Sequence, residues 1–251
     1  MTTGAIELIT EGAANHAMAD WGAAVVRGLV DVRFPRVGSF ETLRNWEDSD
    51  QEGSIVGSPI YSEGYAEFDS GSAYLQTATP SSINLTIISV LKLPVVPTDT
   101  TNSGVVAGNL LNGISGFIFY VGLTGGQVAL LARRVGSNAG VPVNGSIASL
   151  LFSGADPLVE RCVCLKMRQV GVNYGVQVRD LTRGVNGTEV LTANPPVLGG
   201  NIAIGSSATI TGSSHHLCDV IHNVELTDDE INKQYLQLQE YYAALPVPIL
   251  I

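Results

Sequence analysis

The sequence predicts an all-β protein: a two-sheet antiparallel sandwich with a C-terminal helix and an N-terminal arm. Three observations favour this class. The 251 residues include 28 glycines and are rich in Val, Ile and Thr, a composition that suits strands and tight turns rather than a helical bundle. Short apolar or alternating segments are separated by Gly, Pro, Asn and Ser at intervals typical of sandwiches. Only the end of the chain, from Thr227 onward, shows a clear helical period.

Several segments carry individual strand signals. LTIISVLKLP (85–94) is apolar on both faces, which is typical of a strand inside a sandwich. GFIFYVGL (116–123) and QVALLARR (127–134), joined by TGG, predict a hairpin. RCVCLKMRQ (161–169) alternates, so Val163, Leu165 and Met167 face one way and Cys162, Cys164, Lys166 and Arg168 the other. The remaining strands are expected in 54–80, 173–184, 201–212 and 217–224.

The helix is predicted over residues 228–245. Thr227 followed by Glu230 fits a capping box, in which each side chain satisfies a backbone N–H of the other residue. Pro246 and Pro248 end the segment. An apolar stripe follows helical spacing and consists of Ile231, Tyr235, Leu238, Tyr242 and Leu245.

The chain is expected to divide into an arm, residues 1–37, and a sandwich with its helix, residues 38–251. The Ala-rich stretch 15–30 and Pro35 distinguish the first part, which can be a docking segment or an edge element of the main domain. The apolar end, ALPVPILI (244–251), is expected either to fold back on the sandwich or to insert into a neighbour, because an exposed apolar terminus would aggregate.

Charge limits the range of partners. The net charge of −10 argues against nucleic acid. Only 14% of residues are charged, and residues 100–132 contain no charge at all. Because soluble domains usually expose charged side chains, we expect a homo-oligomer or a larger assembly to cover this surface. No membrane span and no signal peptide are expected, because turn residues interrupt the apolar stretches and the start lacks a basic region.

Two groups of residues have the chemistry of metal ligands. Asp48, Asp50 and Glu52 alternate in the acidic stretch 45–53, but a solvated loop is favoured over a calcium site because the further oxygen ligands are missing. His215, His216, Cys218 and His222 suit zinc by type. On a strand, His216, Cys218 and His222 would share a face, yet the last two lie about 13 Å apart, so sheet packing is favoured.

The order of the segments resembles the concanavalin A-like lectin/glucanase superfamily, in its laminin G-like jelly-roll branch. The resemblance covers about residues 38–245. It is carried by YAEFDSGSAYLQT (65–77), LTIISVLKL (85–93), RCVCLKMRQVGVNYGVQVRDLTRG (161–184), and IAIGSS (202–207) with DVIHNVELTDDEI (219–231). It implies a jelly-roll sandwich. Chains with this closing pattern and no secretion signal are frequent among virion proteins of tailed bacteriophages.

The departures from the family bear on function. No strand carries the E-x-D-x-x-E set, or a similar set, of the family's glucanases, and the metal loop of the legume lectins is not recognisable. The sequence also lacks G-x-S-x-G, and its three cysteines are expected to be reduced. No catalytic residue, metal or cofactor is therefore predicted.

The function expected first is that of a non-enzymatic structural protein of a phage virion, in the tail or on the capsid surface. It would be made in the host cytoplasm and contact copies of itself and other virion proteins. The alternative is a carbohydrate-binding module that attaches to host-surface glycan through residues not identifiable from the sequence. A glycan hydrolase ranks third.

Overall fold

A computed structural model describes residues 22–35, 42–62, 64–99, 102–110, 114–143, 145, 147–152, 156–208, 210–245 and 247–251. The chain forms two compact units. The larger one comprises residues 27–226, and the smaller one comprises residues 1–26 together with 227–251. Each is described by itself.

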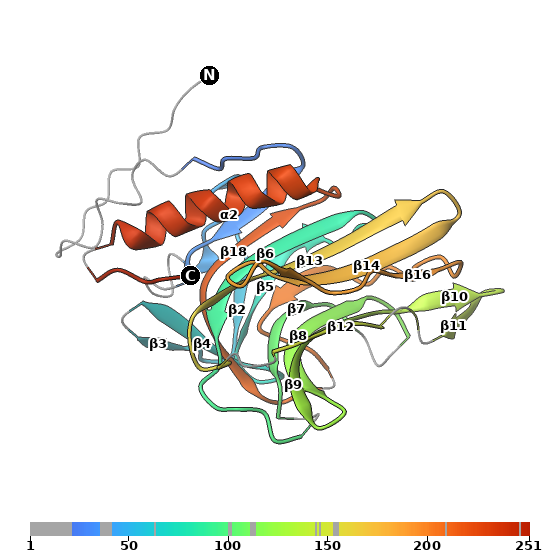
Figure 1. Ribbon diagram of the computed structural model, residues 1–251, viewed down its shortest axis with the longest axis horizontal. Helices are drawn as coiled ribbons and strands as arrows, with labels where there is room; N and C mark the ends of the chain where they lie inside the picture. The colour runs from blue at the N-terminus through green and yellow to red at the C-terminus, as the bar shows by residue number, and fades with distance from the viewer. Residues whose placement is uncertain are drawn as a thin grey trace. The chain divides into compact units, whose positions relative to one another are not determined.

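The larger unit is a jelly-roll sandwich of two antiparallel sheets, which confirms the predicted fold class (Figure 1). Sheet A has the strand order β15-β14-β13-β6-β18-β4-β3, with β1 also paired to β18 and β16 to β14. Its strands are β1 (Leu29–Arg33), β3 (Ile60–Ser62), β4 (Tyr65–Asp69), β6 (Leu85–Lys92), β13 (Arg161–Val170), β14 (Asn173–Asp180), β15 (Val185–Asn186), β16 (Val190–Thr192) and β18 (Ser213–His222).

Sheet B has the order β12-β9-β8-β7-β17-β5-β2, and a separate small hairpin joins β10 to β11. The strands are β2 (Ser54–Val56), β5 (Tyr74–Pro80), β7 (Gly104–Gly108), β8 (Phe117–Thr124), β9 (Gln127–Arg134), β10 (Gly136–Asn138), β11 (Val141–Val143), β12 (Ile147–Leu151) and β17 (Asn201–Ile204). The predicted hairpin is β8–β9. Gly125 and Gly126 form its turn at φ 57° and 79°, values that favour glycine.

The core lies between the sheets, where alternation along each strand directs one set of side chains inward. Val163, Leu165 and Met167 of β13 belong to the same buried cluster as Phe119 and Leu130 of sheet B, as the sequence predicts. We call this side of sheet A its inner face and the opposite side its outer face. Cys162 and Cys164 alternate with these core residues and therefore lie on the outer face.

A β-bulge in β18 changes the face on which its later residues lie. His216 pairs with Leu91 of β6, but the next partner, Val90, pairs with Cys218, so Leu217 is the extra residue. His216 consequently lies on the inner face, whereas Cys218 and His222 lie on the outer face. The expectation that His216, Cys218 and His222 share one face is therefore wrong.

The inner face also encloses an ion pair. The Arg33 guanidinium binds both carboxylate oxygens of Asp31, and both side chains are completely buried. The Thr79 hydroxyl donates to the same carboxylate at 2.9 Å. Arg33 also donates to the carbonyl oxygens of Leu43 and Gln51, the latter at 3.0 Å. Because an unpaired charge in such a site is very unfavourable, this pair fixes β1 and the segment that follows it.

The acidic stretch 45–53 is therefore more than the solvated loop that its composition predicts. The buried Asn45 side chain accepts a hydrogen bond from the Val32 N–H at 3.1 Å and donates to the Val30 carbonyl at 2.9 Å. The Trp46 N–H donates to the Val32 carbonyl at 3.0 Å. The start of the stretch and the Gln51 carbonyl thus contact β1, while Asp50 and Glu52 remain exposed.

The predicted arm, residues 1–37, contains a strand of the sandwich. β1 occupies Leu29–Arg33 and pairs with the second half of β18. This part of the range fits the alternative interpretation, an edge element of the main domain. Residues 1–21 and 36–41 lie outside the described residues, so docking by the arm stays a prediction.

The smaller unit contains α2 (Asp228–Ala243). The predicted capping box is present, because Thr227 Oγ1 accepts from the Glu230 N–H at 3.3 Å and Glu230 Oε2 accepts from the Thr227 N–H at 2.7 Å. The helix ends two residues before the predicted position. Among the described residues, no helix has the length and apolar character needed to span a membrane.

The C-terminal segment folds back on this helix. The carbonyl of Ile251 accepts hydrogen bonds from the Tyr235 hydroxyl at 3.1 Å and from the Gln239 amide at 2.8 Å. Val247 and Leu250 remain 73% and 84% exposed. Part of the apolar end is thus available to a neighbour, as one of the two sequence-based alternatives requires.

Replacement of Arg33 tests the buried ion pair. We expect Arg33→Met to lower the free energy of unfolding by about 3–5 kcal/mol, because Asp31 would be left as an unpaired buried charge. The double variant Asp31→Leu/Arg33→Met should recover part of this loss. Exposed Lys233→Met is the control and should change stability by less than about 0.5 kcal/mol. Urea unfolding measures all three, and an Arg33→Met effect no larger than the control would contradict the account.

Candidate ligand-binding site

The inner face holds a serine, a histidine and an aspartate in hydrogen-bonding sequence. Ser214 Oγ lies 3.1 Å from His216 Nε2, and His216 Nδ1 lies 3.1 Å from the Asp219 carboxylate. This order resembles a catalytic triad. However, all three residues are 0% exposed, and the Ser214 hydroxyl donates to the Val105 carbonyl at 2.7 Å. No substrate can reach this serine in the folded sandwich, so the network joins β18 to β7 structurally.

The residues with metal-ligand chemistry are dispersed. Because of the bulge in β18, His216 lies on the inner face of sheet A, whereas His215, Cys218 and His222 lie on the outer face. His222 Nδ1 lies 3.0 Å from the Arg27 carbonyl. Asp48 stabilises its own turn by accepting hydrogen bonds from the Asp50 N–H at 3.1 Å and from the Gln51 amide at 3.0 Å. Among the described residues, no three His, Cys, Asp or Glu side chains are grouped closely enough for a metal ion.

The three cysteines lie on the outer face of sheet A and none forms a disulfide. All are buried, and burial raises the pKa of the Cys162 thiol well above its ordinary value. A thiol held in its protonated form is a poor nucleophile and a poor metal ligand. Cys162 is therefore not a reactive group.

Five side chains form a line of functional groups across the outer face at one end of sheet A. In the strand register, Glu67 of β4 lies opposite His215 of β18, and His215 lies opposite Lys92 of β6. Glu160, directly before β13, forms an ion pair with Lys92 at 2.8 Å. Tyr65 lies two residues from Glu67, on the same face. We call this set the Tyr65 row: Tyr65, Glu67, Lys92, Glu160 and His215.

An aromatic stack forms the centre of the Tyr65 row. The rings of Tyr65 and His215 are 4.0 Å apart and nearly parallel, at 9°. The Lys92 ammonium lies 5.3 Å from the Tyr65 ring centre. Tyr65 is half-buried, and the side chains of Lys92, Glu67 and Glu160 are 25%, 29% and 28% exposed. The row thus presents an aromatic ring and charged groups to solvent in a fixed arrangement.

His215 is the most enclosed member of the row. Its Nε2 lies 3.2 Å from the Glu67 carboxylate, whereas its Nδ1 is buried and meets no hydrogen-bond partner within the described part of the chain. Burial lowers the pKa of His215, and the nearby Glu67 carboxylate opposes that shift only in part. The imidazole is therefore neutral near pH 7.

The two glutamates of the row are held by different partners. Glu67 on β4 and Glu160, directly before β13, have backbone positions about three strand spacings apart, or roughly 14 Å along the sheet. Their carboxylates contact His215 and Lys92, respectively.

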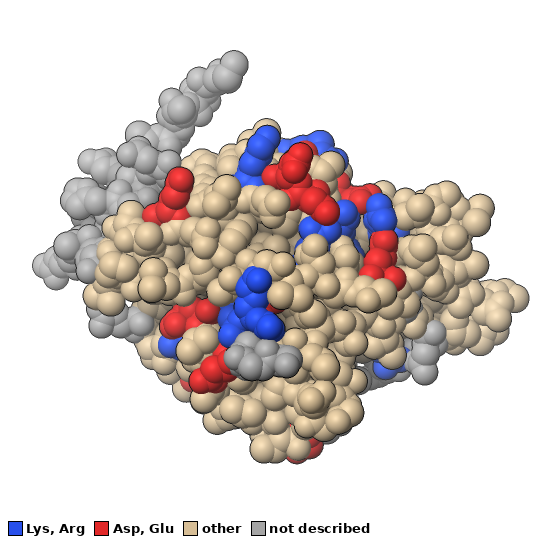
Figure 2. Space-filling view, in the orientation of Figure 1, with Lys and Arg blue, Asp and Glu red and all other residues tan. Residues whose placement is uncertain are grey.

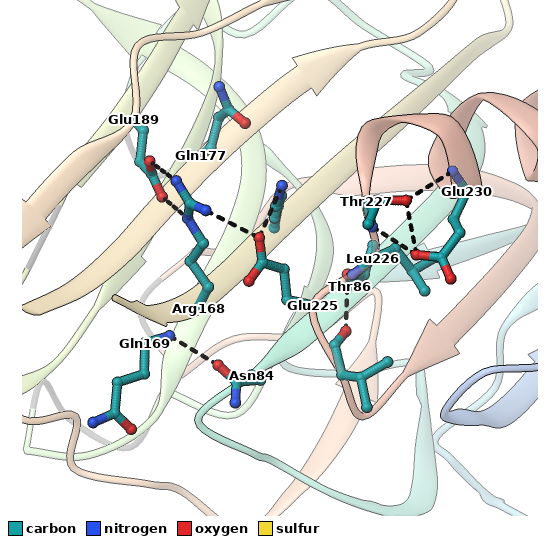
Figure 3. A network of polar contacts seen from close by, with 12 residues as sticks. Asn84, Thr86, Arg168, Gln169, Gln177, Glu189, Glu225, Leu226, Thr227 and Glu230 are labelled. Atoms are coloured by element: carbon teal, nitrogen blue, oxygen red, sulfur yellow. Dashed lines mark hydrogen bonds and ion pairs between the residues drawn. The ribbon is translucent and has the colours of Figure 1, made fainter. Parts of the chain in front are cut away.

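A second charged cluster lies at the other end of the same face (Figure 3). Arg168 of β13 makes two hydrogen bonds of 2.6 Å to Glu189 and one of 3.2 Å to Glu225. Lys166 binds Glu225 at 3.1 Å. Glu189 raises the pKa of Arg168 and is itself held at a lowered pKa by that contact. Because the charges neutralise one another, this cluster ties β13 to two loops and offers little to a ligand.

Charged side chains are gathered in a few places on the face shown in Figure 2, with wide uncharged areas between them. The distribution of charged residues along the sequence therefore does not indicate the position of the Tyr65 row. The row draws on residues 65–67, 92, 160 and 215, which only the sheet pairing brings together. A Tyr and a Glu two apart in a short strand were the single local signal, and such pairs are common in half-buried strands.

Comparison with known proteins supports the fold. No family model and no curated protein matches the chain. Among solved structures, it is similar to the ganglioside-binding botulinum neurotoxin type C (TM-score 0.60, 10% identity, 84% of this chain and 51% of that one). It is also similar to the botulinum neurotoxin type G receptor-binding domain (TM-score 0.57, 14% identity, 84% and 52%). A legume lectin-like domain from Entamoeba histolytica matches at TM-score 0.47, with 11% identity over 68% of this chain and 90% of that one.

The chain spans about half the length of the toxin structures. At these identities the likeness is one of fold alone. It does not transfer a site.

The pH dependence of stability tests the state of His215. Its pKa in the folded protein lies below the ordinary value of 6.5, so the folded state binds fewer protons than the unfolded state as the pH falls through that value. The stability it contributes is present above about pH 6.5 and is lost below it. We expect His215→Gln to reduce the difference in unfolding free energy between about pH 7.5 and about pH 5, measured by urea unfolding. All other titrating groups are common to both proteins, so an unchanged difference would contradict the assignment.

Proposed function

We propose that the sandwich is a non-enzymatic glycan-binding module that contacts its ligand through the Tyr65 row. The observation that carries the proposal is the half-buried Tyr65 ring, stacked on His215 and flanked by partly exposed Glu67, Lys92 and Glu160. One similar toxin interacts with gangliosides, which supports only the use of this fold in glycan binders.

The chemistry of a pyranose matches the row. The C–H groups on one side of the sugar ring pack against the face or edge of an aromatic side chain. Its hydroxyl groups donate to carboxylates and accept from an ammonium group. Lys92 and the two glutamates supply these partners next to the ring.

The row is also ordered before any ligand binds. His215 is held by Glu67 and by the Tyr65 ring, and Lys92 by Glu160. Side chains that are already fixed lose little entropy on binding, so a shallow surface can still bind a sugar with useful affinity.

Removal of the aromatic ring tests this proposal. We expect Tyr65→Ala to weaken binding to glycans retained by the unmodified protein, on an array and in calorimetric titration, by about 1 kcal/mol, or roughly fivefold. Tyr74→Ala, which removes a half-buried Tyr from sheet B, is the matched control. Loss of binding in the control alone, or in neither variant, would contradict the proposal.

We also propose, as a second candidate, a structural role in a phage virion; a sheet edge suited to self-association supports only the assembly part of this proposal. β12 is the outermost strand of sheet B, and Ile147 and Leu151 on it are 53% and 39% exposed. Residues 135–155 contain no charged side chain. Natural edge strands usually carry charges or prolines that prevent pairing with another chain. A second copy that paired its own β12 antiparallel with this strand would bury the exposed Ile147 and Leu151 of both copies.

Charges on this edge test the assembly. We expect Ile147→Lys/Leu151→Lys to shift the protein toward monomer by about tenfold or more in dissociation constant, measured by sedimentation equilibrium. Val172→Lys, at an 80% exposed position in the β13–β14 turn, is the control. A protein that is monomeric at high concentration without any substitution would contradict this second candidate and leave glycan binding unaffected.

A further inference from the structure

We infer that the Tyr65 row selects glycans without anionic groups: it takes neutral, hydroxyl-rich pyranose chains and rejects those that carry a carboxylate. This inference rests on the proposed glycan-binding function and adds the class of ligand. It follows from the charge of the row and from the direction of its hydrogen-bonding groups.

The charges of the row are unbalanced toward acid. Glu67 and Glu160 are both acidic, whereas Lys92 is the single permanent cation of the set, and its ammonium is already bound by Glu160 at 2.8 Å. Asp69, exposed and two residues from Glu67 along β4, adds a third acid on this face. The chain as a whole carries a net charge of −10. A ligand carboxylate would therefore meet repulsion both near the row and at longer range.

Most hydrogen-bonding groups that the row offers to a ligand are acceptors, so the ligand must supply donors. With Nε2 of neutral His215 directed at a carboxylate, its proton lies on that nitrogen, and Nδ1 is left as an acceptor. Nδ1 is buried and has no partner among the described residues, so it is closed to a ligand, and the acceptors that a ligand can reach are the carboxylate oxygens of the partly exposed glutamates. Glu67 and Glu160 each use one oxygen for their contact within the row, which leaves the second oxygen of each as an acceptor.

A sugar hydroxyl can donate to these acceptors and still accept from Lys92. A carboxylate is acceptor-only and cannot donate to any of them. The row thus favours hydroxyl groups over carboxylates both by its charge and by the direction of its hydrogen bonds.

Matched ligands test the selectivity. The probes are a neutral oligosaccharide that binds on an array and the same oligosaccharide capped with sialic acid, titrated calorimetrically into the full chain. We expect the neutral form to bind about tenfold tighter or more. Glu67→Gln/Glu160→Gln removes two charges and supplies amide donors, so it should reduce the ratio to about threefold or less. Exposed Glu52→Gln, distant in sequence and on the 45–53 stretch, is the control and should keep the ratio.

The outcomes separate the two proposals. Equal or tighter binding of the sialylated form by the unmodified protein would overturn the selectivity and leave glycan binding intact. The same ratio in the double variant, with an unchanged circular dichroism spectrum and thermal midpoint, would also overturn it. No binding of any glycan would overturn the proposed function and the selectivity together.

Discussion

The enclosed Asp31–Arg33 ion pair is the constraint on which the larger unit depends. Both side chains lie between the sheets without solvent contact, and burial raises the pKa of Asp31 despite the adjacent guanidinium. Such a pair is tolerated only when every polar group has a partner. Thr79, Leu43 and Gln51 provide these partners from three different segments. The ion pair therefore links β1 to β5 through Asp31, and to Leu43 and the acidic stretch through Arg33.

β18 connects the buried contacts of the sandwich to the outer face of sheet A. Its inner residues, Ser214, His216 and Asp219, form a buried network with the Val105 carbonyl. Its outer residue His215 carries the contacts to Tyr65 and Glu67. Because adjacent residues of one strand cannot move independently, the buried network fixes the direction of the exposed stack. A surface site built in this way is preorganised, which favours recognition of a weakly binding ligand such as a sugar.

Local patterns in the sequence were sufficient for many elements. The alternation of 161–169 placed the core residues of β13 correctly, and Thr227 with Glu230 located the start of α2. Such local patterns could not predict the β-bulge or the contacts between segments that are distant in the sequence. Leu217 interrupts the alternation of β18, and no residue type there signals a bulge. Asn45 and Arg33 make their contacts with other segments of the chain. The sequence therefore placed β1 in an arm and the acidic stretch in a solvated loop. The Tyr65 row arises from strand order, which a single sequence does not specify.

The claim that the outer end of sheet A is the ligand surface can be tested most directly by NMR. The backbone and imidazole resonances of labelled protein would be followed during titration with a neutral oligosaccharide. The account predicts the largest shifts at Tyr65, Glu67, Lys92 and His215, with small shifts at the Arg168 cluster and along β12. Shifts confined to those other regions, or spread over loops while the row stays unchanged, would contradict it.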